Sequence, residues 1–413
     1  MKPLAGVEGG RGTSLAGGGW ARARVAGTKA ARGAIRDARG TQTAPDGVWR
    51  RLTGHAGAVH CLALSPDNQR LYSGGKDGDV RAWEHAGEDD ADSASTRPTG
   101  RCVLVMSGHR GAVCALAVDP SGKRLYSAGA DNAVRVWMLV DGSCLRSTNL
   151  FELSHADTNS YHVAPQRAYS HSFAMHQHKV YGMALSRDAG RCFAGCSDKD
   201  VKVWDVSTGT LKVALKGHEG PVGALAVFHS SSGRILTGSG DATVRAWDLE
   251  RNRCDCVMEG HSGPVLSLVI SSDDRRVYSA SSDASIRVWE VTFTSGAGGV
   301  CEGVCLRVMR DCHQGNIVRC LAVSKTHGSL NFGILFSGGE DKKVRLWRGG
   351  DGEQLCSLKG HTDWVSDIVV NDQNTVLCSA SQDGSILVWR IGRVVRQQLV
   401  FSEAASVFLD LKR

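Results

Sequence analysis

One spacing recurs seven times along this chain of 413 residues and limits what it can fold into. In each copy an Asp precedes a Trp by six residues. A His stands 22 residues before the Asp in five copies, 23 in one and 28 in one. A spacing kept this often indicates an array of equivalent units rather than several unrelated domains. The seven sets are His55, Asp77 and Trp83; His109, Asp131 and Trp137; His176, Asp198 and Trp204; His218, Asp241 and Trp247; His261, Asp283 and Trp289; His313, Asp341 and Trp347; and His361, Asp383 and Trp389.

The fifth copy, residues 260–290, indicates what each unit is. Apolar runs at 265–270, 277–280 and 286–289 are separated by polar turns. Short runs rich in β-branched residues and bounded by turn residues are typical of β-strands. None of these strands can bury its apolar face alone, so each unit needs neighbours of its own kind. The chain is therefore predicted to be all-β.

The repeats resemble those of the WD40 repeat family over residues 47–392. The resemblance implies a single seven-bladed β-propeller, in which each blade is a small antiparallel sheet. We expect a disordered Gly-, Ala- and Arg-rich tail at 1–46, the propeller at 47–392 and a C-terminal extension at 393–413. In the family, a strand before the first repeat completes the last blade, so residues 48–52 are expected to close the ring. Residues 394–401 compete for the same edge.

In this family the His, a Ser or Thr, the Asp and the Trp of a repeat form one hydrogen-bonded chain. The resemblance gives the hydroxyl role here to Ser73, Ser127, Thr237, Ser279, Ser337 and Ser379. The third repeat departs from the pattern, because Ala194 stands at the hydroxyl position and Met175 replaces the Gly that usually precedes the His. We expect this blade to be the least stable. A His beside an Asp could also be a catalytic pair, but we interpret each pair as structural because it is used within its own blade.

Charge is concentrated at the N-terminus. The formal net charge is +7, and residues 1–46 carry eight Lys or Arg against three Asp or Glu, which leaves +2 for the rest. A near-neutral propeller is not typical of a nucleic-acid-binding platform. The tail has the composition of an organelle transit peptide, although a flexible tail is the simpler interpretation. No apolar run reaches the ~20 residues of a membrane helix. We expect the protein in the cytoplasm or nucleus.

Fourteen cysteines raise the question of disulfides or metal. Most fall within expected strands, where a reduced thiol packs as a small apolar side chain. Two groups of residues could be proposed as zinc ligands: one is Cys301, Cys305, Cys312 and His313, and the other is the histidines around the long insertion at 151–175. Neither group has the paired ligand spacing that is typical of zinc sites. We also find no phosphate-binding loop and no nucleophile elbow. The sequence therefore predicts no cofactor, no metal and no enzymatic activity.

Binding is expected on the face that carries the Gly-His turns, because function in a propeller lies in its loops. In the family's topology, exposed positions flank the first residue of each inner strand and precede each Asp. Trp364 is the strongest candidate for an interface anchor, and the alternative is that it packs against the next blade. The candidate positions are His60, Lys76, Arg110, Lys179, Tyr181, Glu219, Asn316, Glu340, Trp364 and Gln382.

Three functions remain open. The first, which we prefer, is a non-catalytic scaffold that docks peptide or protein partners, as a monomeric propeller within a larger complex. The second is a substrate-recognition subunit of a ubiquitin ligase. Relatives that join cullin-based ligases often carry an Arg three residues after a repeat Trp, and here Ser207 and Glu250 stand at that position. The third is an RNA- or ribosome-associated protein, which needs a basic stripe that a near-neutral ring lacks.

Overall fold

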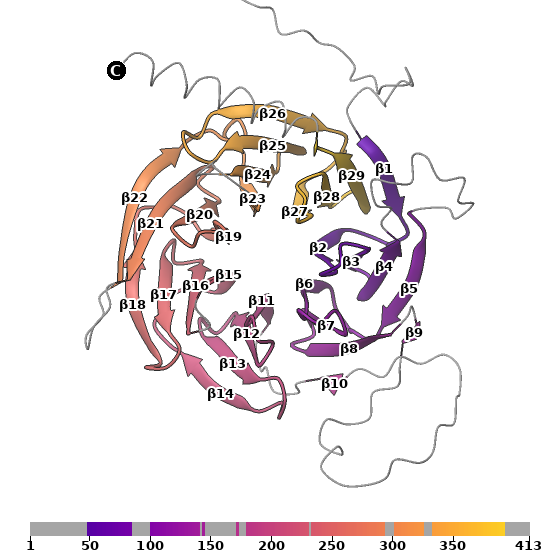
Figure 1. Cartoon of the computed structure of the whole chain (residues 1–413), viewed down its shortest axis with the longest axis horizontal. Helices are drawn as coiled ribbons and strands as arrows, with labels where there is room; N and C mark the ends of the chain where they lie inside the picture. The colour runs from indigo at the N-terminus through magenta and orange to yellow at the C-terminus, as the bar shows by residue number, and fades with distance from the viewer. Residues whose placement is uncertain are drawn as a thin grey trace, which may run out of the picture.

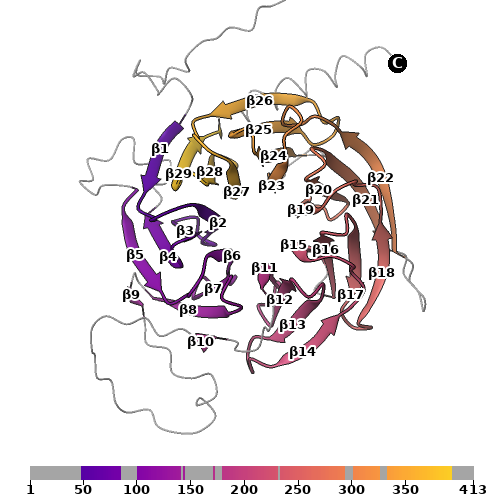
Figure 2. The same ribbon diagram turned by 180° about the vertical axis from the view of Figure 1, so that it is seen from behind.

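The computed structural model describes residues 48–84, 100–140, 143–144, 171–172, 179–230, 233–293, 301–325 and 333–392. They form seven antiparallel sheets arranged radially in a ring (Figures 1 and 2). The prediction of a seven-bladed propeller is confirmed. The tail at 1–46, the extension at 393–413 with its segment 394–401, and most of the insertion at 151–175 lie outside the described residues.

In blades 1 to 6 the strands follow one another in chain order from the inner rim outward, as Figure 1 shows. Blade 1 contains β2 (Val59–Leu64), β3 (Arg70–Gly75), β4 (Asp79–Glu84) and β5 (Cys102–Ser107). Blade 2 contains β6 (Val113–Val118), β7 (Arg124–Gly129), β8 (Val134–Val140), β9 (Ser143–Cys144) and β10 (His171–Ser172). Blade 3 contains β11 (Val180–Leu185), β12 (Arg191–Cys196), β13 (Val201–Asp205) and β14 (Leu211–Leu215). Blade 4 contains β15 (Val222–Val227), β16 (Arg234–Ser239), β17 (Val244–Asp248) and β18 (Arg253–Met258). Blade 5 contains β19 (Val265–Ile270), β20 (Arg276–Ser281), β21 (Ile286–Phe293) and β22 (Cys301–Met309). Blade 6 contains β23 (Val318–Val323), β24 (Ile334–Gly339), β25 (Lys343–Arg348) and β26 (Gln354–Lys359).

Blade 7 is built from both ends of the described chain. Its inner strands are β27 (Val365–Val370), β28 (Val376–Ser381) and β29 (Ser385–Arg390), and its outer strand is β1 (Val48–Thr53). The Arg51 guanidinium donates to Ser385 Oγ at 2.9 Å and to the Gly360 carbonyl at 2.8 Å. Leu52 is only 6% exposed, in a cluster that spans blades 7 and 1. This pairing covers the edge of β29 that would otherwise remain open.

The outer edge of blade 2 differs from the others because two short strands replace one. Strand β9 pairs with β8 at Leu139 and Val140, and β10 pairs with the same strand at Arg135 and Val136. Residues 145–170, which include most of the insertion around 151–175, connect these two short strands along the chain. Every other blade has one continuous outer strand.

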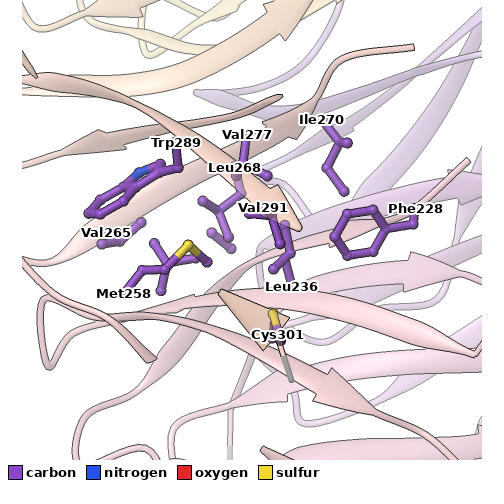
Figure 3. Packing of buried hydrophobic residues seen from close by; sticks show 13 residues of the cluster. Phe228, Leu236, Met258, Val265, Leu268, Ile270, Val277, Trp289, Val291 and Cys301 are labelled. Atoms are coloured by element: carbon purple, nitrogen blue, oxygen red, sulfur yellow. The ribbon is translucent and has the colours of Figure 1, made fainter. Parts of the chain in front are cut away.

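The hydrophobic core lies between neighbouring blades. One cluster, shown in Figure 3, joins Phe228, Leu236 and Met258 of blade 4 to residues of blade 5 such as Val265 and Trp289. Equivalent clusters fill the other junctions. Because each blade buries its two faces against two neighbours, no blade is complete without the ring.

A register irregularity occurs at the start of every inner strand, on the side of the ring that carries the Gly-His turns. In all seven blades the ladder between the first and second strands skips the second residue of the inner strand. A β-bulge of this kind takes a side chain out of the regular alternation and re-aims it. The residues at the skipped positions are His60, Cys114, Tyr181, Gly223, Leu266, Arg319 and Ser366.

Candidate functional site at the inner rim

Six of the predicted four-residue clusters are described, and all six form the same chain of contacts. The His Nδ1 lies 2.6 to 3.0 Å from an Asp carboxylate oxygen. The His Nε2 lies 2.7 to 2.8 Å from the Ser or Thr hydroxyl oxygen. The same oxygen accepts the Trp indole N–H at 2.7 to 2.9 Å. Each cluster therefore ties a loop, two strands and a turn together.

The tryptophans of these six clusters belong to the hydrophobic core and not to a surface that a partner could contact. Each is between 1% and 7% exposed. Each also packs in one of the apolar clusters that fill the junctions between blades. Among the residues that the sequence singled out, they are therefore excluded from direct binding, and their indoles stabilise the ring. The six are Trp83, Trp137, Trp247, Trp289, Trp347 and Trp389.

A neutral His satisfies every hydrogen bond of the cluster. The indole N–H can only donate, so the hydroxyl accepts it, and the hydroxyl proton can then be donated to an unprotonated His Nε2. The His Nδ1–H then donates to the carboxylate. Burial lowers the pKa of His55, His109, His218 and His261, against the opposing effect of the neighbouring Asp. Both ring nitrogens are used within the cluster, so neither is available as a general base.

The Asp of each cluster is held ionised. Burial alone would raise the pKa of Asp283, but hydrogen bonds from Ser285, His261 and the Ser262 backbone N–H outweigh it and lower the pKa to about 2. Equivalent backbone N–H groups reach the Asp in blades 1, 2, 4 and 7. In blade 6 the nearly buried Arg345 donates to Asp341 at 2.7 Å.

The third cluster is only partly described, because His176 and Met175 lie outside the described residues. Ala194 is fully buried in β12, where the other blades carry a hydroxyl. Asp198 forms an ion pair with Lys202 at 2.7 Å, and Trp204 is buried. The reduced stability expected for this blade stays a prediction.

Trp364 stands on the inner rim where blades 6 and 7 meet, and 39% of it is exposed. The Arg319 guanidinium of blade 6 stacks on its indole, 4.6 Å from the ring centroid. Arg319 in turn donates from Nε and Nη2 to Glu340 Oε1, at 3.0 and 2.5 Å. An Arg held by a carboxylate and laid over an aromatic ring gives a rigid amphipathic surface.

Two more predicted face residues continue this surface across the seam to blade 1. The Gln382 side-chain amide lies 3.4 Å from His60 Nδ1, and the Gln382 backbone N–H donates to the Trp364 carbonyl at 3.0 Å. Burial, then Lys76, lowers the pKa of His60, so this imidazole is neutral at pH 7. We call Trp364, Arg319, Glu340, Gln382, His60 and Lys76 the rim patch.

The other predicted face residues belong to blades 2, 3, 4 and 6, and their side chains are exposed. They are Arg110, Lys179, Tyr181, Glu219 and Asn316. The Asn316 side chain donates to the His313 carbonyl at 2.8 Å and so completes a turn. Arg319 was not among the residues predicted from the sequence, although it occupies the same skipped position as His60 and Tyr181. That position was the signal that could have found it.

Asp367 lies in β27 below the rim patch and was also missed. Its carboxylate accepts the Leu62 N–H of β2 at 2.7 Å and the Ile368 N–H at 2.8 Å. The Ser366 hydroxyl reaches the Val59 carbonyl across the same seam. These bonds join the inner strands of blades 7 and 1; Trp364 directly precedes the first of these strands, and His60 lies in the second. Burial raises the pKa of Asp367 to about 7, against the effect of the two N–H donors.

The raised pKa of Asp367 gives a pH-dependent prediction. A carboxyl whose pKa is higher in the folded state stabilises the fold fully below its unfolded value, ~3.9, and this contribution is lost as the pH rises through about 7. We expect the free energy of unfolding of the wild type, relative to Asp367→Asn, to be about 2 kcal/mol larger at about pH 5.5 than at about pH 8. Denaturant unfolding at both pH values measures it. The other titratable groups are common to both proteins and cancel, and a difference independent of pH would contradict the assignment.

The described residues contain no group of three or more His, Cys, Asp or Glu side chains placed to hold a metal ion. They also contain no helix long and apolar enough to cross a membrane.

Comparison with known proteins connects this geometry to a family. The WD40 family model, described as WD domain, G-beta repeat, matches residues 48–84, 100–138, 168–205, 209–248, 252–290, 303–348 and 352–390. Guanine nucleotide-binding protein subunit beta-5b of Danio rerio is 29% identical over 344 residues, covering 82% of this chain and 75% of that protein. Protein groucho of Drosophila melanogaster is 27% identical over 60% of this chain and 28% of its own length. Elongator complex protein 2 of Arabidopsis thaliana is 30% identical over 30% of this chain and 16% of its own length.

Proposed function

The chain belongs to the WD40 repeat family, and we propose that it is a non-catalytic scaffold that docks a protein segment on the rim patch. Propellers of this family generally act as protein-interaction scaffolds. The observation that supports the rim patch as the docking site is the half-exposed Trp364 stacked with Arg319. Trp and Arg are the residue types most enriched among those that dominate interface energies.

The surroundings of Trp364 favour tight binding because they are already ordered. Glu340 fixes the Arg319 guanidinium, and the Gln382 backbone N–H holds the Trp364 carbonyl. Asp367 and Ser366 join the strands on either side of the seam. A partner therefore meets side chains that lose little conformational freedom on binding, which is the main benefit of preorganisation.

The chemistry of the rim patch defines the partner's binding segment. The exposed part of the indole takes an apolar or aromatic side chain, while the Gln382 amide and the Glu340 carboxylate offer hydrogen bonds beside it. The proposal includes a monomeric propeller acting within a larger complex, in the cytoplasm or nucleus.

Truncation of Trp364 tests the proposal. Removing a central aromatic anchor typically costs ~2 kcal/mol or more of binding free energy, which is roughly thirtyfold in affinity. We expect Trp364→Ala to lose most of the partners recovered by quantitative affinity purification, while its melting temperature stays that of the wild type. Val304→Ala is the matched control, because Val304 is 47% exposed but lies on the outer strand β22.

The outcomes of this purification also separate the alternatives. Partners that depend on RNA would favour the RNA-associated function, and ligase subunits recovered together with Trp364-dependent substrates would favour the ubiquitin-ligase function. A folded Trp364→Ala protein that keeps every partner would contradict docking on the rim patch.

A further inference from the structure

The outer strands of blades 4 and 5, β18 and β22, lie side by side on the circumference of the ring (Figure 1). Gly303 of β22 allows their close approach. A Cβ at this position would lie 2.4 Å from Met258 Cγ and 3.3 Å from Cys256 Sγ. Cys301 is two residues before Gly303 and so lies on the same face of β22. Figure 3 shows Cys301 and Met258 in one cluster, and Cys256 packs against that cluster.

The two thiols that meet at this junction are chemically different. Cys301 is 6% exposed, whereas Cys256 is half-buried. Hydrogen bonds from the Cys301 thiol and, to a smaller extent, from the Gly303 N–H lower the pKa of Cys256 to about 7, whereas burial acts in the opposite direction. The same bond, together with burial, raises the pKa of Cys301. Cys256 is therefore the more readily ionised thiol of the pair, and Cys301 is the thiol that donates to it.

We propose that Cys256 and Cys301 form a redox-reactive dithiol, which hydrogen peroxide converts to a disulfide that joins the outer strands of blades 4 and 5. The reaction needs a partly exposed nucleophile in direct contact with a second thiol. This junction supplies both, with Cys256 as the attacking residue and Cys301 as the resolving residue.

The reaction balances with peroxide as the only oxidant. The Cys256 thiolate attacks one peroxide oxygen, the O–O bond breaks, and the departing hydroxide takes up a proton as water. Cys256 is then a sulfenic acid. Cys301 loses its proton and attacks the Cys256 sulfur, the S–O bond breaks, and the second oxygen leaves as water. Two thiols are oxidised by two electrons in all, and one peroxide is reduced to two waters.

Other described cysteines lack this combination. Burial raises the pKa of Cys192 and of Cys378 to about 12, and both are buried. Cys254 is half-buried on β18, two residues from Cys256, but burial raises its pKa. Cys254 is therefore the matched control, because it shares the strand and the exposure of Cys256 without its hydrogen bond from a second thiol.

Peroxide oxidation of the full chain, followed by digestion without reductant and mass spectrometry, tests the proposal. We expect the wild type and Cys254→Ser to lose two hydrogen atoms in mass and to yield the cross-linked peptide that contains Cys256 and Cys301. We expect Cys301→Ser to accumulate a sulfenic acid at Cys256 that a dimedone probe traps, and Cys256→Ser to yield neither product.

Alkylation kinetics at neutral pH provide a second measurement on the reduced wild type. We expect iodoacetamide to label Cys256 at least about tenfold faster than Cys254, because the thiolate is the reactive form. Oxidation that joins other cysteines, or that proceeds equally in Cys256→Ser, would overturn the proposal. Equal labelling of Cys254 and Cys256 would overturn it as well.

Discussion

A chain that lacks residues 1–53 is expected to lose most of its stability, because it lacks β1. The deletion removes the burial of Leu52, worth ~2 kcal/mol, and the ladder that pairs β1 with β29, at ~1 kcal/mol per net hydrogen bond. The total, roughly 4–8 kcal/mol, is comparable to the whole stability of many domains. It also exposes the edge of β29, so association between chains should follow. Thermal unfolding and size-exclusion chromatography measure both effects.

A chain that lacks only residues 1–47 is the control, since it keeps every contact described for β1. We expect its melting temperature to match that of the full chain. If the two truncated chains melt together and both remain monomeric, β1 does not close the ring as the structure indicates.

Ser279→Ala is expected to destabilise the protein by ~2–6 kcal/mol, although it removes a single oxygen atom. That oxygen is fully buried and bonds to both His261 Nε2 and Trp289 Nε1. Its loss leaves two buried polar groups without their partner, at ~1–3 kcal/mol each. Denaturant unfolding gives the change in free energy.

The matched control for this change is Ser262→Ala, since Ser262 belongs to the same blade and its side chain is exposed. Its backbone N–H still donates to Asp283 in the variant. We expect a change within ~0.5 kcal/mol. A Ser279→Ala protein as stable as this control would show that the clusters do not hold the blades together.

The number of blades could be predicted from sequence because one interval hardly varies. The six residues from Asp to Trp cover a tight turn and the start of the third strand, as in Asp283 and β21, and an insertion there would shift the pairing of that strand with the second. The His-to-Asp interval contains a loop and does vary. It reaches 28 residues in blade 6, where the loop between β23 and β24 is longer.

The rim patch could be predicted only in part, because its contacts cross between blades. Arg319 and Trp364 lie on different sheets, and Asp367 meets a backbone N–H 305 residues away. No local periodicity marks such pairs. The same holds for Cys256 and Cys301, whose contact depends on a glycine that lets two outer strands approach closely. The sequence therefore predicts contacts within one repeat, whereas contacts between repeats depend on how the ring places neighbouring blades against one another.

Site-specific photo-crosslinking in cells tests the docking claim most directly. A photoreactive phenylalanine analogue would replace Trp364 in one full-length variant and Val304 in a second. We expect discrete protein adducts from position 364 that are absent at position 304. Adducts from position 304 with none from position 364 would contradict it, because partners would then bind the circumference of the ring rather than the rim patch.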